Sequence, residues 1–377
     1  MYRQTFNYEA ERASAQVSYT EKAENYNEFY AYLHLLHCEN DSFTEQLKRI
    51  FLTIERVKKE SLLDGSSPVF VRFYLSDSAN EAEPLQKMLK EQSSLSCAVS
   101  IIEQPPLDGS KIAVLMYFVS EIRVRQGQEF TSFQGADGIE HYWWCGPQIA
   151  ECSSEHQTRM LFEMYEEALH RHQMSVKENC IRTWFYVQNI DVNYAGMSRA
   201  RNEFFAQHGL TADTHYITST GIQGRSSDYR VTVRMDGYSI KGLDEKNIQY
   251  LDARDYLSPT RIYNVTFERG VCLHFKDRLK CYISGTASID KDGNVLYIGD
   301  VVRQTERALL NVEKLLEEGN SSLDDLAFLT VYLRDVSDTP AVKKLLDKRL
   351  PHVPMLIVYA PVCRPTWLIE MEGISVK

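Results

Sequence analysis

The feature that most constrains the fold of this 377-residue chain is a short motif that occurs three times. Each copy is an apolar run that contains a tyrosine and ends on a polar residue. The three copies are Phe73–Asp77, Phe185–Asn189 and Val331–Asp335. Recurrence at long intervals indicates repeated structural units, each of which contributes part of the core.

The same order of elements surrounds each motif. A strand and a long helix precede it, and a shorter helix and two strand-like runs follow it. In the first copy the apolar residues of the long helix alternate between spacings of four and three, as one helix face requires. They are Phe43, Leu47, Ile50, Ile54 and Val57. The pattern predicts an α+β chain of three β-α-β-α-β-β units at residues 1–122, 123–259 and 260–377, and a polar linker at 241–260 that ends the second unit.

A unit of this kind carries both helices on one face of its sheet, so the other face must be buried against something else. Three units in one chain can bury their open faces against each other. We therefore expect sheets packed around a pseudo-threefold barrel with the helices outside.

Composition argues against several classes of function. The net charge of −10 leaves no basic surplus for neutralising the phosphates of a nucleic acid. No apolar run approaches the roughly 20 residues that span a bilayer, and the N-terminus does not open a signal peptide, so we expect a cytoplasmic chain without a membrane partner. The eight cysteines lack CxxC spacing and are expected to be reduced, with no metal site.

Two acids stand out in the last strand-like run, Glu370 and Glu372. Side chains alternate along a strand, so both carboxylates should lie on one face. The aligned positions of the other copies hold Ala113, Leu115, Thr232 and Arg234. We therefore expect acids only in the third copy, with Arg234 facing Glu372 and Glu370 left for chemistry.

The C-terminal copy resembles the Rid (YjgF-type) family of imine deaminases. The matching stretches are Ser284–Ser288, Gln304–Val312, Val331–Asp335 and Ile369–Gly373. That family forms homotrimers with sites between subunits. The resemblance thus implies a single-chain equivalent, either a monomeric pseudo-trimer or a weak homo-oligomer.

From about Arg182 to its end, the chain also resembles the chorismatase family, which is built on Rid-like domains. The stretches that carry this resemblance are Arg182–Tyr186, Gly196 with Arg199 and Arg201, Ser219–Ile222, Phe267–Arg269, Ser284–Ile289, Gly299–Val301 with Gln304 and Thr305, and Cys363–Arg364. One departure concerns the deaminases, which hold the substrate carboxylate with an arginine at the position of Leu356.

The chorismatase resemblance implies a small dicarboxylate substrate, chorismate, whose enol ether is hydrolysed to pyruvate and a hydroxybenzoate or dihydroxycyclohexadiene acid without a cofactor. Glu370 would be the general acid, because apolar neighbours can raise the pKa of its carboxyl. The expected substrate-binding residues are Arg364, Arg182, Tyr186, Gly285, Thr286, Arg201 and Arg269.

Alternatives remain open at this point. Arg182 could instead pair with Glu372, and Tyr186 recurs as Tyr74 and Tyr332, which favours a structural role. An imine deaminase and a non-catalytic protein that binds small acids are the other candidate functions.

Overall fold

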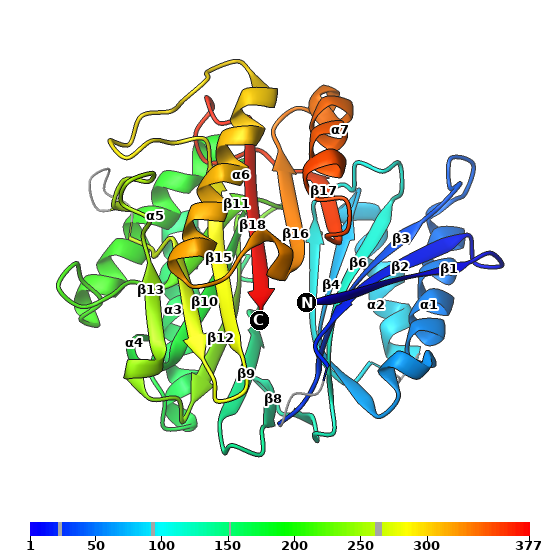
Figure 1. Cartoon of the computed structure of the whole chain (residues 1–377), viewed down its shortest axis with the longest axis horizontal. Helices are drawn as coiled ribbons and strands as arrows, with labels where there is room; N and C mark the ends of the chain where they lie inside the picture. The colour runs from blue at the N-terminus through cyan, green and yellow to red at the C-terminus, as the bar shows by residue number, and fades with distance from the viewer. Residues whose placement is uncertain (22–24, 92–94, 151, 261–265) are drawn as a thin grey trace.

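Three six-stranded sheets form the centre of the chain, and each is covered by helices on one face (Figure 1). The architecture is that of a computed structural model, which describes residues 1–21, 25–91, 95–150, 152–260 and 266–377. The N-terminal unit lies on the right of Figure 1, the second on the left, and the third between them. The expected α+β chain of three Rid-like units is confirmed.

The first unit has the strand order β1-β2-β3-β6-β4-β5. Its elements are β1 (Tyr2–Tyr8), β2 (Ala13–Tyr19), β3 (Glu28–Leu35), α1 (Phe43–Val57), β4 (Ser66–Leu75), α2 (Ser78–Glu91), β5 (Ala98–Glu103) and β6 (Ile112–Ser120). Helix α1 contains all five residues of the predicted apolar face, and Ser42 and Glu45 form a capping box at its start. This reciprocal pair satisfies backbone donors that a helix N-terminus otherwise leaves open.

The second unit repeats this topology with the order β7-β8-β9-β12-β10-β11. Its elements are β7 (Arg125–Gln126), β8 (Thr131–Gln134), β9 (Glu140–Cys145), α3 (Ser154–Arg171), α4 (Val176–Asn179), β10 (Cys180–Val187), α5 (Ile190–Gln207), β11 (Thr218–Gln223) and β12 (Val233–Lys241).

The third unit has the order β13-β14-β15-β18-β16-β17. Its elements are β13 (Ile248–Leu251), β14 (Gly270–His274), β15 (Leu279–Ala287), α6 (Val301–Glu318), β16 (Leu326–Leu333), α7 (Thr339–Arg349), β17 (Met355–Tyr359) and β18 (Ile369–Val376). The segment 241–260, expected to be a linker, differs from that expectation because it supplies β13, the edge strand of this sheet.

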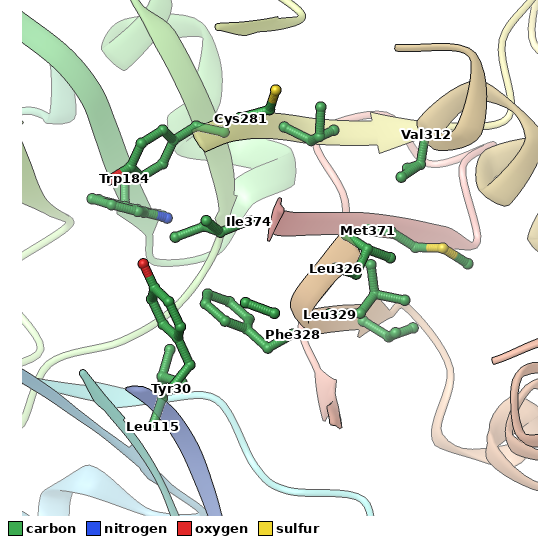
Figure 2. Packing of buried hydrophobic residues seen from close by; sticks show 14 of the residues in the cluster. Tyr30, Leu115, Trp184, Cys281, Val312, Leu326, Phe328, Leu329, Met371 and Ile374 are labelled. Carbon is green, nitrogen blue, oxygen red and sulfur yellow. The ribbon is translucent and has the colours of Figure 1, made fainter. Parts of the chain in front are cut away.

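The inner faces of the three sheets meet in one apolar core (Figure 2). Tyr30 and Leu115 come from the first unit, Trp184 from the second, and Phe328 and Ile374 from the third, and all are buried. The helices pack on the opposite faces, as α1 does on the first sheet. The described ranges contain no helix that is both long and apolar enough to cross a membrane.

Adjacent units bond in the same way at all three interfaces. The last parallel strand of each unit, β5, β11 or β17, bonds to the loop before the closing strand of the next unit. The backbone contacts are Glu103 N to Arg225 O (3.0 Å), Gln223 N to Pro361 O (3.1 Å), and Tyr359 N to Pro105 O (2.8 Å). This repetition closes the ring of units around the pseudo-threefold axis.

One pair of cysteines departs from the expectation of reduced thiols. Cys272 and Cys281 form a disulfide, while six cysteines are free. The two residues lie opposite each other in the antiparallel β14–β15 ladder. Their separation along the chain did not reveal this, because the register of the hairpin was not predicted.

Candidate active site

Glu370 and Glu372 both point to the same face of β18, as the alternation predicts, yet they lie in different environments. Both side chains are buried, and Ile369 and Met371 point to the other face, toward the core. Strand β18 is central, paired with β15 on one side and β16 on the other. Two buried acids on a central strand need separate explanations.

Glu372 is part of the contact between the second and third units. Its carboxylate accepts hydrogen bonds from Arg182 Nη2 (2.6 Å), Trp184 Nε1 (3.1 Å) and Thr220 Oγ1 (2.5 Å). The alternative in which Arg182 pairs with Glu372 is therefore confirmed. The expected contact with Arg234 is wrong, because Arg234 Nη1 donates to the carbonyl of Ile101 (3.3 Å) between the first and second units.

The strand registers show which residues correspond to Glu370. In each unit the motif tyrosine lies opposite one residue of the closing strand. The pairs are Tyr74 with Ala113, Tyr186 with Arg234, and Tyr332 with Glu370. Glu370 thus has no acidic counterpart.

The counterparts of Glu372 are Leu115 and Asp236, two residues beyond Ala113 and Arg234. The sequence alignment of the second unit was therefore displaced by two residues, and the expectation that acids occur only in the third unit is wrong. Asp236 accepts from Arg72 Nη2 (3.1 Å) and Ser100 Oγ (2.6 Å), which repeats the arrangement around Glu372 one interface earlier.

Glu370 lies in a pocket of about 1200 Å³ between the second and third units. Helix α5 contributes Tyr194 and Arg201 to the wall, and β11 contributes Ser219. The third unit contributes Arg269 and Arg364, among others. The structure brings five of the predicted site residues to this pocket: Glu370, Gly285, Arg201, Arg269 and Arg364.

The Glu370 carboxyl is arranged to keep its proton. It is 5% exposed and has no hydrogen-bond or ion-pair partner among the residues that the structure describes. Burial, and then the negative charge of Glu372, raise its pKa to about 8, although Arg269 and Arg182 oppose the shift. At neutral pH this side chain is a carboxylic acid and can donate a proton.

A buried cation lies on the α5 wall of the same pocket. Arg201 is 1% exposed, and its Nε and Nη2 atoms have no hydrogen-bond partner in the described part of the chain. A buried guanidinium without an anion is costly unless a ligand supplies one. Arg201 therefore indicates a site for an anionic ligand.

Two more arginines complete the positive wall. The guanidinium of Arg269 donates to the carbonyl of Ser258 (3.0 Å), and that of Arg364 lies over the ring of Trp367, 4.8 Å from its centroid. Burial lowers the pKa of Arg269 to about 10; Glu370 counteracts this effect and Arg364 adds to it. Arg269 therefore stays protonated at neutral pH.

Gly285 has a different role from the expected one. Its N–H donates to Thr220 Oγ1 (2.9 Å) and is not directed at a ligand. A Cβ on this residue would collide with Glu370 Oε1, so only glycine leaves room for the Glu370 carboxyl. Gly285 therefore does not offer the expected backbone donor to a ligand; its lack of a side chain makes room for Glu370.

Three predicted substrate-binding residues do not line this pocket. Arg182 is engaged by Glu372, and Tyr186 is buried beside Arg72. Thr286 donates its hydroxyl to the carbonyl of Ser284 (2.8 Å). Arg182 and Tyr186 are inward-facing strand residues of the unit contacts, whereas Thr286 lies opposite Met371 and shares its face of the sheet.

The sequence prediction missed Tyr194, Ser198, Ser219, Cys363 and Trp367 as pocket residues. A helical wheel would have found Tyr194 and Ser198, because they share a face of α5 with Arg201. Within the described residues, no cluster of three or more His, Cys, Asp or Glu side chains could hold a metal ion.

The fold as a whole matches a solved protein. A crystal structure of a chorismatase superposes with a TM-score of 0.62 at 15% identity, covering 82% of this chain and 93% of that one. At this identity the match establishes the shared fold.

The sequence comparison concerns the third unit. The family profile described as Endoribonuclease L-PSP matches residues 275–377. The 3-aminoacrylate deaminase RutC of Acinetobacter baylyi is 28% identical over 96 residues, which are 25% of this chain and 76% of that protein. A RutC family protein of Pyrococcus abyssi is 32% identical over 98 residues, 26% of this chain and 77% of that protein. On the basis of its third unit, the chain belongs to the RutC family.

Proposed function

We propose that the chain is a chorismatase-like hydrolase that cleaves the enol ether of chorismate. The observation that carries this proposal is that one pocket holds a protonated acid, Glu370, and a buried cation, Arg201, whose Nε and Nη2 have no hydrogen-bond partner among the residues that the structure describes. The substrate needs both features, because it is a dicarboxylate that must be protonated on carbon before its ether can break.

The chemistry requires only side chains and water. Glu370 donates its proton to the terminal CH₂ carbon of the enolpyruvyl group, which leaves a cation at the ether carbon. Water adds to this carbon and loses a proton that restores the Glu370 carboxyl. The resulting hemiketal collapses to pyruvate and a dihydroxycyclohexadiene acid, and loss of water from that acid would give a hydroxybenzoate. General acid catalysis of this kind contributes about 10²–10⁴-fold.

The arginines are assigned to the two carboxylates. Arg201 on α5 holds one, and Arg364 with Arg269 on the opposite wall holds the other, since planar guanidinium groups bind carboxylates through paired hydrogen bonds. Arg182, which the resemblance assigned to this role, is replaced by Arg201. We expect a monomer, because one chain supplies both walls.

An imine deaminase is the second candidate, favoured by the deaminase RutC among the relatives. The strand that faces Glu370 from the second unit is β11, and the residue that corresponds there to Leu356 is Thr220. Its hydroxyl donates to Glu372, so no arginine occupies the position that the deaminase resemblance requires.

The test is incubation of the purified chain with chorismate and continuous detection of pyruvate, alongside the Glu370→Gln variant. Turnover by the wild type and its loss in the variant support the proposal. Activity only on 2-aminoacrylate-type imines would assign the second function. Tight binding of small dicarboxylates without turnover would assign the non-catalytic alternative.

A further inference from the structure

A second pocket lies between the third and first units. Its place at this interface corresponds to the place of the Glu370 pocket at the interface between the second and third units. Its volume is about 1100 Å³, close to that of the first. Strand β17 and helix α7 line it from the third unit, as β11 and α5 line the first pocket from the second unit. The equivalent backbone positions of the two interfaces therefore enclose two cavities of similar size.

The two pockets differ in the charges at corresponding places on their walls. An isolated backbone bridge marks the equivalent place at each interface: Ile222 with Val362 at the first pocket, and Val358 with Pro106 at the second. Two residues after Val362 the chain has Arg364, and two residues after Pro106 it has Asp108. The α7 wall presents Asp347 beside Lys343, whereas the α5 wall of the first pocket presents Arg201.

The floor of the second pocket carries a different chemical group. Ala113 occupies the strand position that Glu370 occupies in the third unit, so this position carries no carboxyl here. Next to it lies His34, whose Nδ1 is 3.2 Å from Asp108 Oδ2. In the neutral imidazole, a carboxylate at this distance holds the proton on Nδ1, and Nε2 is then a hydrogen-bond acceptor.

Two acceptors at this floor lack a donor. His34 Nε2 and Gln16 Oε1 are buried atoms with no hydrogen-bond partner among the described residues, and both side chains line the pocket. Buried polar atoms are nearly always hydrogen-bonded, so these acceptors indicate a ligand that brings donors.

Asp108 supplies the charge that would attract such a ligand. Burial raises its pKa, but the hydrogen bond from His34 and those from Ser110 lower it to below the usual value. Ser110 donates through its N–H (3.0 Å) and its hydroxyl (2.7 Å) to Oδ1. The carboxylate is therefore ionised at neutral pH.

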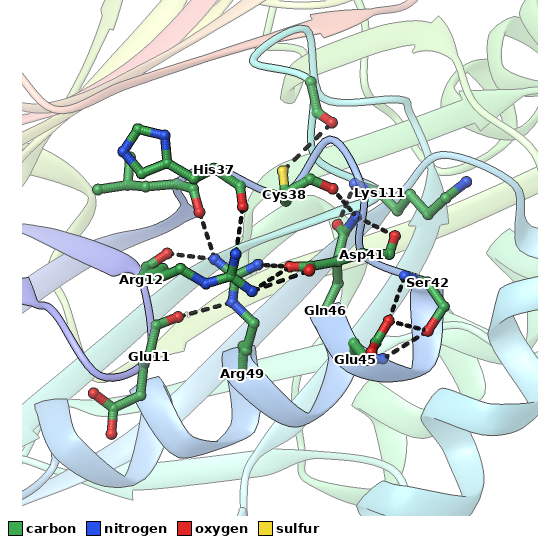
Figure 3. Close-up of polar contacts among 12 residues, drawn as sticks. Glu11, Arg12, His37, Cys38, Asp41, Ser42, Glu45, Gln46, Arg49 and Lys111 are labelled. Atoms are coloured by element: carbon green, nitrogen blue, oxygen red, sulfur yellow. Dashed lines mark hydrogen bonds and ion pairs between the residues drawn. The ribbon is translucent and has the colours of Figure 1, made fainter.

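The rim of the pocket is fixed by a network of hydrogen bonds (Figure 3). Arg49 donates to the carbonyls of Glu11 (2.8 Å), Arg12 (2.6 Å) and Leu36 (2.5 Å), and Arg12 Nη1 donates to the carbonyl of His37 (2.9 Å). Leu36 and His37 line the pocket. Their backbone is thus held in place before any ligand arrives, which reduces the ordering cost of binding.

We propose that this second pocket binds a small amine, an ammonium group on an apolar body. The ammonium group provides donors for His34 Nε2 and Gln16 Oε1 and a positive charge for Asp108. Apolar wall residues such as Leu107, Met355 and Ile357 receive the body of the ligand. Lys343 reduces the negative charge of the pocket through its bond to Asp347 (2.6 Å).

The probe for this site is benzylamine, with benzyl alcohol and benzoate as matched compounds of the same shape. Ligand-observed NMR titration of the full chain at neutral pH should give saturable binding of benzylamine, weaker binding of the alcohol, and none of benzoate. Saturable binding is expected below ~10 mM, the range for a fragment of this size.

Two variants on opposite sides of the pocket locate the binding. Asp108→Asn should weaken benzylamine about tenfold, because a charged hydrogen-bond acceptor is lost. The exposed substitution Lys343→Met should tighten it about threefold, because a like charge is removed. Glu370→Gln, in the other pocket, should leave the affinity unchanged.

Three outcomes would overturn the proposal. They are benzoate binding as tightly as benzylamine, no saturable benzylamine binding, and benzylamine affinity that neither Asp108→Asn nor Lys343→Met changes. If Asp108→Asn fails to fold, the benzylamine affinity of Lys343→Met alone tests the proposal, because Lys343 is exposed and its substitution should not disturb folding. None of these measurements depends on turnover of chorismate.

Discussion

The pocket between the second and third units and the pocket between the third and first units have equivalent backbones but different charged residues. The first combines Glu370 with four arginines, and the second combines Asp108, Asp347 and Lys343 with two histidines. At the remaining interface the position of Glu370 is held by Arg234, whose guanidinium reaches Ile101 on the neighbouring strand. The fold therefore supplies three equivalent places, and a few side chains decide what each can bind.

The largest effect should come from the proton donor. Glu370→Gln keeps the size of the side chain and removes the acidic proton, so pyruvate release from chorismate should fall about 10³-fold while the thermal unfolding midpoint is kept or rises. The matched change in the other pocket is Ala113→Glu. Added to Glu370→Gln, it should restore no turnover, because the arginines are absent there. Recovery of activity would mean that the acid alone distinguishes the two pockets.

The next effect concerns the ionic contact between the second and third units. Glu372→Leu leaves Arg182 buried without its carboxylate and should lower the free energy of unfolding by about 3–5 kcal/mol. The double variant Arg182→Phe/Glu372→Leu reproduces the apolar residues Phe328 and Leu115 of the third–first interface.

Most of the lost stability should return in this double variant, because an apolar contact can replace a buried ion pair. Chemical denaturation of the wild type, Glu372→Leu and the double variant measures the three free energies of unfolding. A double variant no more stable than Glu372→Leu would show that the two interfaces are not interchangeable.

Arg201 should show a smaller effect on activity and none on folding. Arg201→Gln removes a buried charge whose Nε and Nη2 have no hydrogen-bond partner in the described ranges of the chain, so the unfolding midpoint should stay or rise. The kcat/KM for chorismate should drop about 10²-fold, mostly through KM, because a substrate carboxylate loses its partner. Unfolding scans with steady-state kinetics check both parts, and a strongly destabilised variant would assign Arg201 a structural role.

The smallest effect is the pH dependence of the same site. The pKa of Glu370 is raised to about 8 by burial, so kcat/KM should fall as pH rises through about 8. Because the pKa is higher in the folded chain than in the unfolded chain, the protonated Glu370 carboxyl stabilises the folded state. This contribution to the free energy of unfolding is complete below the ordinary pKa of a glutamic acid and is lost as pH rises through about 8.

Glu370→Gln should abolish this part of the pH dependence of stability. Unfolding midpoints of both proteins between pH 5 and pH 9 measure the difference. Parallel curves would show that the carboxyl does not titrate in this range.

Much of the architecture could be predicted from the sequence, because the repeated motif and the helix periodicity are local patterns. Helix α1 begins at Phe43 and ends at Val57, the first and last residues of the apolar spacing. The alternation in β18 also placed Glu370 and Glu372 on one face. Strand β13 was missed, because a short edge strand in a charged segment has little apolar pattern.

The roles of individual residues were harder to predict. The second unit was aligned two residues out of register, which kept the correct face of the strand but assigned Thr232 in place of Arg234 and concealed Asp236. Arg182 and Arg201 look alike in sequence, and both follow the chorismatase pattern. Arg182 pairs with Glu372 of the neighbouring unit, whereas Arg201 pairs with no acid among the described residues, and this difference depends on which unit lies opposite each arginine.

The sequence by itself determined the tripled unit, the helices and the acid that has no counterpart, since these depend on residues near each other along the chain. Only the tertiary structure decided which acid is neutralised and which keeps its proton. It also decided that Asp108 and Arg364 occupy equivalent places. The physical reason is that burial and the charges of a neighbouring unit set the ionisation of a side chain, and both arise only when the three sheets pack together.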